Sequence, residues 1–270
     1  MKKILHILYR ILKFKGSLTQ RGSILYFFIK QEILNFINSS SNIIFLKYKI
    51  IGIRNREIIY LLNEIFLNNE YYFFSNKKSP LIIDCGSNIG ISILYFKHLY
   101  PDCEIIAFEA NPYIFEVLQK NIYNNNLKNV KINNLALSNS KSELKFYINE
   151  SNYGTLTGSI NSNRGGKKEL NINSDKLSNY IKNIETIDLV KMDVEGAEFN
   201  IINDLFNENL ITKVNEYIIE YHLNVEGDNS LNTLSSFLKK FEQNGFKYNI
   251  RADFNNIDTF QDVLIHFYKK

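Results

Sequence analysis

The chain has 270 residues, with 32 basic and 28 acidic side chains, so its formal net charge is only +4. This length fits one α/β domain of ordinary size with an N-terminal extension. So small a charge gives no support for nucleic-acid binding. The two cysteines, Cys85 and Cys103, have no pairing pattern and no histidine at metal-binding spacing. A reducing, cytoplasmic compartment therefore fits the composition.

Residues 1–15 contain apolar residues at helical spacing among lysines and an arginine. This pattern predicts a basic amphipathic helix that lies on an anionic membrane surface, at the inner face of the membrane. A helix packed against the rest of the protein is the alternative. No apolar run reaches the roughly 18 residues that a transmembrane helix requires. The charges interrupt the apolar part and no cleavage site follows, which argues against a signal peptide.

The following segment predicts a small mixed structure. Residues 16–40 are mostly helical in character, two β-branched segments in 43–53 predict a hairpin, and 54–68 has the apolar face of a packed helix. We place the domain boundary after this segment, with an extension over 1–75 and a catalytic domain over 76–270. A cap over an active site and an assembly surface both remain open roles for the extension.

The stretch Leu81–Gly90 reads as a buried parallel strand, a glycine-bearing turn and the start of a helix. Gly86 and Gly90 allow a sharp turn and a close backbone approach to a ligand, and the next helix points its free N–H groups at that ligand. Asp84 disfavours a polyphosphate and suits an ammonium or sulfonium group, both of which S-adenosylmethionine (SAM) carries. The glycine spacing matches neither a dinucleotide motif nor a P-loop, so a nicotinamide-dependent oxidoreductase is a weaker alternative.

A second apolar strand ends at Glu109, about 20 residues beyond the glycine turn, where an acidic residue binds ribose hydroxyls. Asn111 is a favourable N-cap and Pro112 a favourable first residue for the helix that follows. A third strand is predicted over 130–136, and we expect the segment at its end, 134–138, which includes Ala136, to lie beside the adenine.

Two further groups of polar residues follow buried strands. Asp193 is predicted to face the methionine part of SAM, an acceptor hydroxyl or a divalent cation, whereas Glu195 and Glu198 are expected in a first helical turn, where the dipole favours negative charge. Glu220 and His222 lie two apart in a strand and therefore on one side of it. This predicts a general base, His222, that Glu220 orients.

The segment 153–166 is polar and contains several glycines. It is flanked by a predicted antiparallel strand over 142–149 and by the expected partner of that strand over 167–172. It predicts a mobile loop on the acceptor side, with an exposed hairpin turn as the alternative. Strands that alternate with helices and end in a hairpin predict a mostly parallel sheet with one antiparallel strand near its edge.

Four motifs occur in order: Asp84-Cys-Gly-Ser-Asn-Ile-Gly90, Phe108-Glu-Ala-Asn-Pro112, Lys191-Met-Asp-Val-Glu-Gly-Ala-Glu198 and Glu220-Tyr-His222. Together they resemble the FkbM family of SAM-dependent methyltransferases, from about residue 72 onward, with Ala110 where the family often has proline. The resemblance implies a Rossmann-like class I methyltransferase fold with a mostly parallel seven-stranded sheet, one strand antiparallel, beside a small α+β extension. The residues expected to bind the cofactor are Asp84, Gly86, Ser87, Asn88, Gly90, Glu109, Ala110, Asn111 and Ala136, and those expected to be catalytic are Asp193, Glu220 and His222.

The sequence thus predicts an O-methyltransferase whose acceptor is a small molecule or glycan, preferably a lipid-linked or surface glycan. One alternative is a metal-assisted enzyme in which Asp193 and Glu220 bind Mg²⁺ and lower the pKa of the hydroxyl. Another is a SAM-fold protein without activity that binds a partner or a membrane through its first seventy residues. A non-catalytic scaffold would not need Asp84, Glu109, Asp193 and His222 together, which argues against this reading. The oligomeric state is left open.

Overall fold

The computed structural model describes residues 8–11, 17–34, 42–148, 158–159, 166–223, 234–252 and 261–269. Of the predicted helix over 1–15, only residues 8–11 are described, and they are helical. The predicted acceptor-side loop lies almost entirely outside the described residues. Within the described ranges, no helix combines the length and the apolar character needed to cross a membrane.

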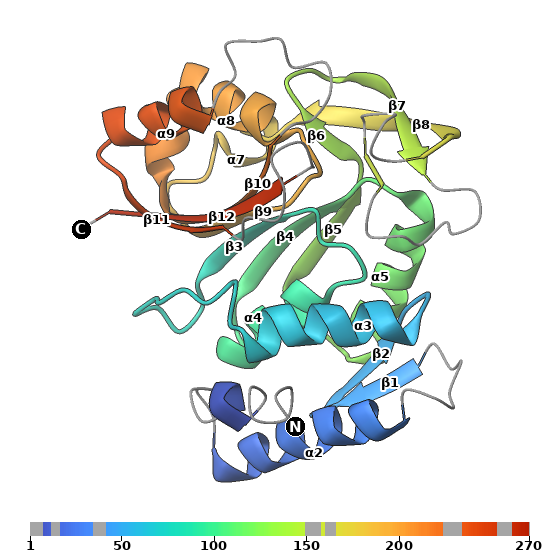
Figure 1. Ribbon diagram of the computed structural model, residues 1–270. Coiled ribbons are helices and arrows are strands. Elements are labelled where there is room, and N and C mark those ends of the chain that lie inside the picture. The colour runs from blue at the N-terminus through green and yellow to red at the C-terminus, as the bar shows by residue number, and fades with distance from the viewer. Residues whose placement is uncertain are drawn as a thin grey trace.

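A seven-stranded sheet forms the centre of the described structure, in the order β11-β12-β10-β9-β3-β4-β5 (Figure 1). Strand β12 pairs antiparallel with β10 and β11, and the remaining neighbours are parallel. The predicted Rossmann-like sheet, mostly parallel with one antiparallel strand near its edge, is confirmed. The strands are β3 (Leu81–Cys85), β4 (Glu104–Glu109), β5 (Val130–Asn134), β9 (Ile187–Met192), β10 (Val214–Leu223), β11 (Lys247–Ala252) and β12 (Gln261–Tyr268).

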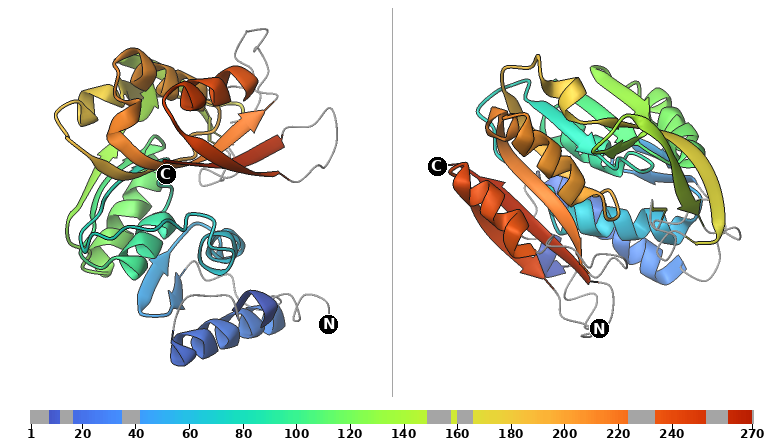
Figure 2. Two further views of the ribbon diagram at one scale, coloured as in Figure 1. Left: turned by 90° about the vertical axis from the view of Figure 1, so that its left-hand side faces the viewer. Right: turned by 90° about the horizontal axis from the view of Figure 1, so that it is seen from above.

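Helices cover both faces of this sheet (Figure 2). The two faces bury separate apolar clusters, and strand β9, at the centre of the sheet, is buried at all of its positions. A parallel strand that is covered on both faces is mostly apolar, which is why such strands can be predicted from the sequence. The helices of one face are α4 (Ile91–Leu99) and α5 (Pro112–Asn124), and those of the other are α7 (Ser178–Ile181), α8 (Glu198–Asn207) and α9 (Leu234–Gln243), with a short 3₁₀ turn, η2 (Ile211–Lys213), before β10.

A separate small sheet contains β6 (Ala136–Ser138), β7 (Ser142–Ile148) and β8 (Lys168–Lys176). Strands β7 and β8 pair antiparallel, as the sequence predicted. The strand predicted over 130–136 extends too far: β5 stops at Asn134, and Ala136 begins β6, which belongs to the other sheet. The amide of Asn134 donates to the carbonyl of Glu109 at 2.8 Å and fixes this break.

The N-terminal extension packs beneath α4 and α5 (Figure 1). Edge-to-face ring contacts run from Phe27 to Phe45, Phe66 and Tyr95, with centroids 5.0, 5.0 and 5.1 Å apart. This chain of rings joins the extension to α4 through one apolar core. The predicted hairpin and helix are confirmed: the elements are α2 (Leu18–Leu34), β1 (Asn42–Phe45), β2 (Tyr48–Ile51), α3 (Asn55–Leu62) and a π-helical turn, η1 (Asn63–Leu67).

Asn121 of α5 and Asn125, the residue that caps its C-terminal end, satisfy the free edge of strand β2. The Asn121 side chain accepts from the N–H of Ile51 and donates to its carbonyl, both at 2.8 Å, and also donates to the carbonyl of Ile89 at 2.8 Å. Asn125 bonds the N–H and carbonyl of Lys49 in the same way. These amides take the place of a neighbouring strand and connect the extension to the glycine turn.

Replacing Asn121 with leucine should destabilise the protein by about 3 kcal/mol or more, because three backbone groups lose their partners and each buried unsatisfied group costs about 1–3 kcal/mol. Chemical denaturation followed by circular dichroism measures this free energy of unfolding. The control is Asn124→Ala on the exposed side of the same helix, for which we expect a change within about 0.5 kcal/mol. Equal losses in the two variants would contradict the proposed edge-capping role.

Candidate active site

The glycine turn between β3 and α4 brings two strand ends into direct backbone contact. Gly86 has φ of +80°, and a Cβ built on it would lie 1.8 Å from the carbonyl oxygen of Asp193. The N–H groups of Gly86 and Ser87 both donate to the carbonyl of Phe108, at 3.0 and 2.9 Å. Gly90, with φ of +91°, is the N-cap residue of α4. Only glycine fits at position 86, because both the conformation and the space exclude a side chain.

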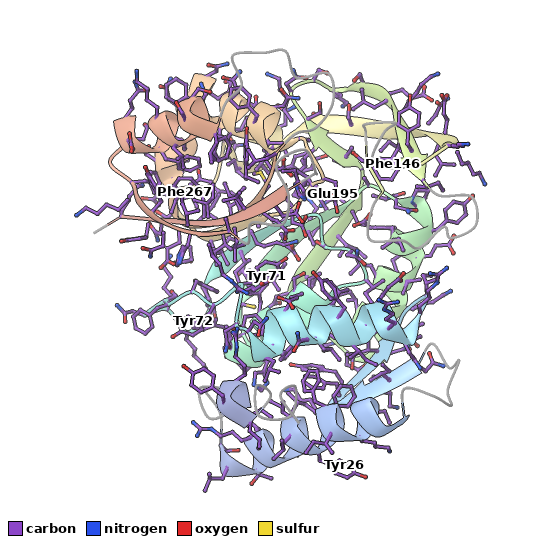
Figure 3. The ribbon with its side chains drawn as sticks, in the orientation of Figure 1. Tyr26, Tyr71, Tyr72, Phe146, Glu195 and Phe267 are labelled. Carbon is purple, nitrogen blue, oxygen red and sulfur yellow. The ribbon has the colours of Figure 1, made fainter. Side chains whose placement is uncertain are left out.

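A cavity of about 330 Å³ opens beside this turn, at the carboxyl ends of the parallel strands, where open α/β sheets bind ligands. The extension forms part of its wall, through side chains from α3 to Tyr71, which lies near the centre of the molecule (Figure 3). Asp84 and Gly90 are not part of the lining. The other residues predicted to bind the cofactor do line it, and these are Gly86, Ser87, Asn88, Glu109, Ala110, Asn111 and Ala136.

Glu109 is fixed at the end of β4 by two backbone donors. Its carboxylate accepts from the N–H of Asn88 at 2.9 Å and from the N–H of Asn111 at 2.8 Å. Burial raises the pKa of Glu109 to about 7, although both N–H donors and the Lys191 ammonium oppose the shift. Asn111 also caps α5, as predicted, by accepting from the N–H of Tyr113 at 3.0 Å. The carboxylate therefore faces the cavity from a rigid position.

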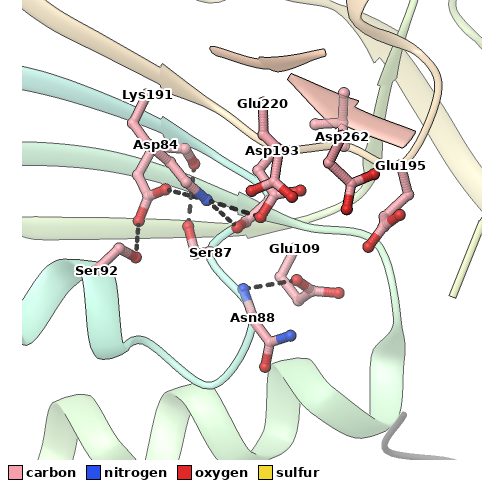
Figure 4. Close-up of polar contacts among 12 residues, drawn as sticks. Asp84, Ser87, Asn88, Ser92, Glu109, Lys191, Asp193, Glu195, Glu220 and Asp262 are labelled. Carbon is pink, nitrogen blue, oxygen red and sulfur yellow. Dashed lines mark hydrogen bonds and ion pairs between the residues drawn. The ribbon is translucent and has the colours of Figure 1, made fainter. Parts of the chain in front are cut away.

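A buried lysine joins the strand ends (Figure 4). The Lys191 ammonium donates to the carbonyl of Gly86 at 2.6 Å and lies 3.5 Å from Asp84 and 3.8 Å from Asp193. It also lies 5.0 Å from the centre of the Tyr71 ring. Burial alone would lower the pKa of Lys191, but Asp84 and Asp193 raise it overall. The side chain is therefore a cation at neutral pH.

The buried imidazole of His222 is surrounded by carboxylates. Its Nδ1 lies 2.8 Å from Glu198, and its Nε2 lies 3.3 Å from Glu195, 3.8 Å from Asp262 and 3.9 Å from Asp193. Burial opposes protonation, but Glu198 and the other carboxylates raise the pKa of His222 to about 10. The imidazole is consequently protonated at neutral pH.

The structure arranges the predicted catalytic pair differently from the sequence expectation. The hydrogen-bonded partner of His222 is Glu198, whereas the Glu220 carboxylate lies 4.0 Å from Nε2. Glu220 lines the cavity and His222 does not. Asp193, and then burial, raise the pKa of Glu220 well above its ordinary value. The expected helical position of Glu195 was wrong: α8 begins at Glu198, and Glu195 lies before it with φ of +59°.

Sequence reasoning gave no role to several residues that the structure brings to the site. Lys191 could have been found from the sequence, since a lysine in a mostly apolar, buried strand requires counter-charges. The sequence gave no indication that Asp262 belongs to the site, because only the antiparallel pairing of β12 with β10 places it opposite His222. Glu64 and Glu70 reach the cavity wall through the fold of the extension.

Comparisons with known proteins agree on a methyltransferase. A family model described as "Methyltransferase FkbM domain" matches residues 84–248. Methyltransferase sdnD of Sordaria araneosa is 29% identical over 182 residues, which cover 56% of this chain and 70% of that protein. The 2-O-methyltransferase NoeI of Sinorhizobium fredii (strain NBRC 101917 / NGR234) is 25% identical over 183 residues, which cover 62% of this chain and 74% of that protein. The crystal structure of methyltransferase FkbM from Methylobacillus flagellatus KT shares the fold with a TM-score of 0.51 at 12% identity, over 99% of this chain and 59% of that one.

Two glycine-to-alanine variants distinguish the steric clash of an added methyl group from the cost of a positive φ angle. Gly86→Ala should destabilise the protein by several kcal/mol or prevent folding, since the new methyl group overlaps the Asp193 carbonyl. Gly245→Ala is the matched control, because Gly245 has φ of +79° and nothing within 4 Å of an added Cβ; it should cost only about 1–2 kcal/mol. Thermal and chemical denaturation measure both. Similar losses would show that the contact with Asp193 is unimportant.

Proposed function

The chain belongs to the FkbM methyltransferase family, and we propose that it is a SAM-dependent O-methyltransferase. The observation that supports this most strongly is the combination, in one cavity, of a glycine turn, the fixed carboxylate of Glu109 and the acidic group around Asp193. A partner-binding or membrane-binding scaffold would not require such a cavity. The family gives the reaction class, and the proposal concerns the cofactor, the acceptor and the residues that act.

The donor groups of the cavity match the parts of SAM. Glu109 presents a carboxylate for the ribose hydroxyls, and Ala136 and Leu137, beyond the end of β5, offer apolar surface for the adenine. The carbonyl of Gly86 and the carboxylate of Asp193 are acceptors for an ammonium group. When bound, SAM supplies an electrophilic methyl group on a sulfonium, and the protein aligns the acceptor oxygen with it.

We assign the proton acceptor to Glu220 and not to His222. Glu220 faces the cavity, and the neighbouring Asp193 carboxylate raises its pKa, so it gains a proton readily when a hydroxyl oxygen attacks. His222, protonated through its bond to Glu198, balances the negative charges and orients them. This reverses the roles that the sequence pattern suggested.

A polyhydroxylated acceptor, such as a sugar of a surface glycan or a secondary-metabolite hydroxyl, suits the rest of the cavity. The wall from the extension contains Tyr60, Glu64 and Glu70, which offer several hydrogen-bond acceptors. The name of the relative NoeI, a 2-O-methyltransferase, supports oxygen as the methylated atom. An anionic acceptor fits less well among so many carboxylates.

A metal-assisted mechanism is a second candidate, because ligand atoms of suitable type converge. Asp193, Glu195 and His222 have one ligand atom each within 4.8 Å of the others, and so do Glu220, His222 and Asp262. A divalent cation bound there would require deprotonated His222 and would lower the pKa of an acceptor hydroxyl.

Calorimetric titration with SAM tests the cofactor assignment and the role of Glu109. Because the pKa of Glu109 is about 7 and the ribose requires the carboxylate, the dissociation constant should increase about tenfold from pH 8 to pH 6. Glu109→Gln should bind weakly and without this pH dependence, whereas Glu104→Gln, at the exposed start of β4, should behave as the wild type. No SAM binding by the wild type would contradict the proposal.

The metal-assisted route makes a separate prediction. If it operates, Mg²⁺ should bind to the wild-type protein in a calorimetric titration, release a proton from His222 and lose affinity in Asp193→Asn, because a charged ligand is removed. Asp102→Asn, on an exposed surface, should leave Mg²⁺ binding unchanged. Absence of Mg²⁺ binding by the wild type would exclude this route and leave Glu220 as the proton acceptor.

A further inference from the structure

The charges around the cavity are strongly unequal. Among the described residues that line it, Lys191 is the only lysine or arginine. Two other cations lie behind the lining: Arg251 pairs with Glu70 at 3.2 Å, and His222, which is bonded to Glu198, also lies between 3.3 and 4.0 Å from four lining carboxylates. Neither side chain lines the cavity itself. The acidic side chains of the lining are Glu64, Glu70, Glu109, Asp193, Glu195, Glu220 and Asp262.

Lys191 lies at a defined end of this cavity. Its ammonium contacts the carbonyl of Gly86 at the glycine turn, and Asp193 at the tip of β9 lies 3.8 Å away. Glu109, the residue proposed for the ribose, lies at the end of β4, on the far side of β3 from β9. A ligand whose ribose meets Glu109 therefore directs its amino-acid part toward Lys191.

We propose that Lys191 binds the carboxylate of the methionine part of SAM and is a cofactor-positioning residue; this inference depends on the proposed function. SAM carries one carboxylate, and in a cavity lined by acidic side chains that group is repelled unless a cation compensates it. Lys191 provides the compensating charge at the correct end, and the acceptors around it, Gly86 and Asp193, suit the adjacent ammonium group of the ligand.

A purely structural role is the competing explanation for Lys191. Its bond to Gly86 and its ion pair with Asp84 would hold the glycine turn whether or not a ligand is present. The two roles differ in ligand dependence. A structural lysine affects every ligand of the turn equally, whereas a carboxylate-binding lysine affects only ligands that carry a carboxylate.

Titration of the purified chain with SAM and with decarboxylated SAM distinguishes these roles. The wild type should bind SAM roughly 10- to 100-fold more tightly than decarboxylated SAM, the range expected for a charge-assisted hydrogen bond. Lys191→Met should lose this preference, because its binding of SAM weakens while its binding of decarboxylated SAM stays unchanged. Lys77→Met is the matched control, because Lys77 pairs with the buried Asp188 at 3.0 Å outside the cavity, and it should retain the preference.

The outcomes separate the inference from the function on which it depends. If the wild type binds neither ligand, the proposed function fails. If the wild type binds both and Lys191→Met weakens both equally, or retains the preference, the carboxylate role of Lys191 is overturned. Should Lys191→Met not fold, because Asp84 is left as an uncompensated buried charge, the double variant Asp84→Asn/Lys191→Met removes both charges and is titrated in the same way.

Discussion

The arrangement of the strand ends depends on the contacts of the buried Lys191 ammonium with the oxygen atoms around it. An isolated charge in the centre of a sheet is strongly unfavourable, and it persists here because oxygen atoms from β3, the glycine turn and β9 surround it. Those same atoms belong to Asp84, Gly86 and Asp193. The requirement to satisfy one cation therefore fixes three groups relative to one another before any ligand binds, which is the preorganisation that methyl transfer needs.

The N-terminal extension is physically continuous with this site. Asn121 and Asn125 bind its strand edge, and Asn121 also bonds the carbonyl of Ile89 in the glycine turn. On the cavity side, the Glu64 carboxylate accepts from two asparagine amides at 3.1 and 2.9 Å. Burial and Glu64 raise the pKa of Glu70 to about 8, so Glu70 is largely protonated at neutral pH. The extension thus supplies a wall of fixed hydrogen-bonding groups on one side of the cavity.

The sequence predicted those features whose causes are local. Buried parallel strands are mostly apolar runs, and the helix cap at Asn111 depends only on its immediate neighbours. Both features could therefore be predicted from the sequence. The partner of His222 was not, because Glu198 reaches it only when α8 packs over β10. Asp262 depends on the return of β12 along β10. The prediction placed Glu195 in the helix, but its left-handed backbone conformation moves the start of α8 to Glu198. Glutamate rarely adopts this conformation, so the sequence did not indicate it.

The excess of carboxylates around the cavity also bears on turnover. Acidic side chains such as Asp193 and Glu220 favour a ligand that carries a positive sulfonium over the neutral thioether that remains after methyl transfer. In the mechanism proposed above, Glu220 takes up the proton of the acceptor hydroxyl, so one negative charge of the cluster is neutralised at the same moment as the ligand loses its sulfonium charge. On this proposal, the attraction that positions the methyl donor weakens once the methyl group is transferred, and the same charge distribution would then assist release of the product.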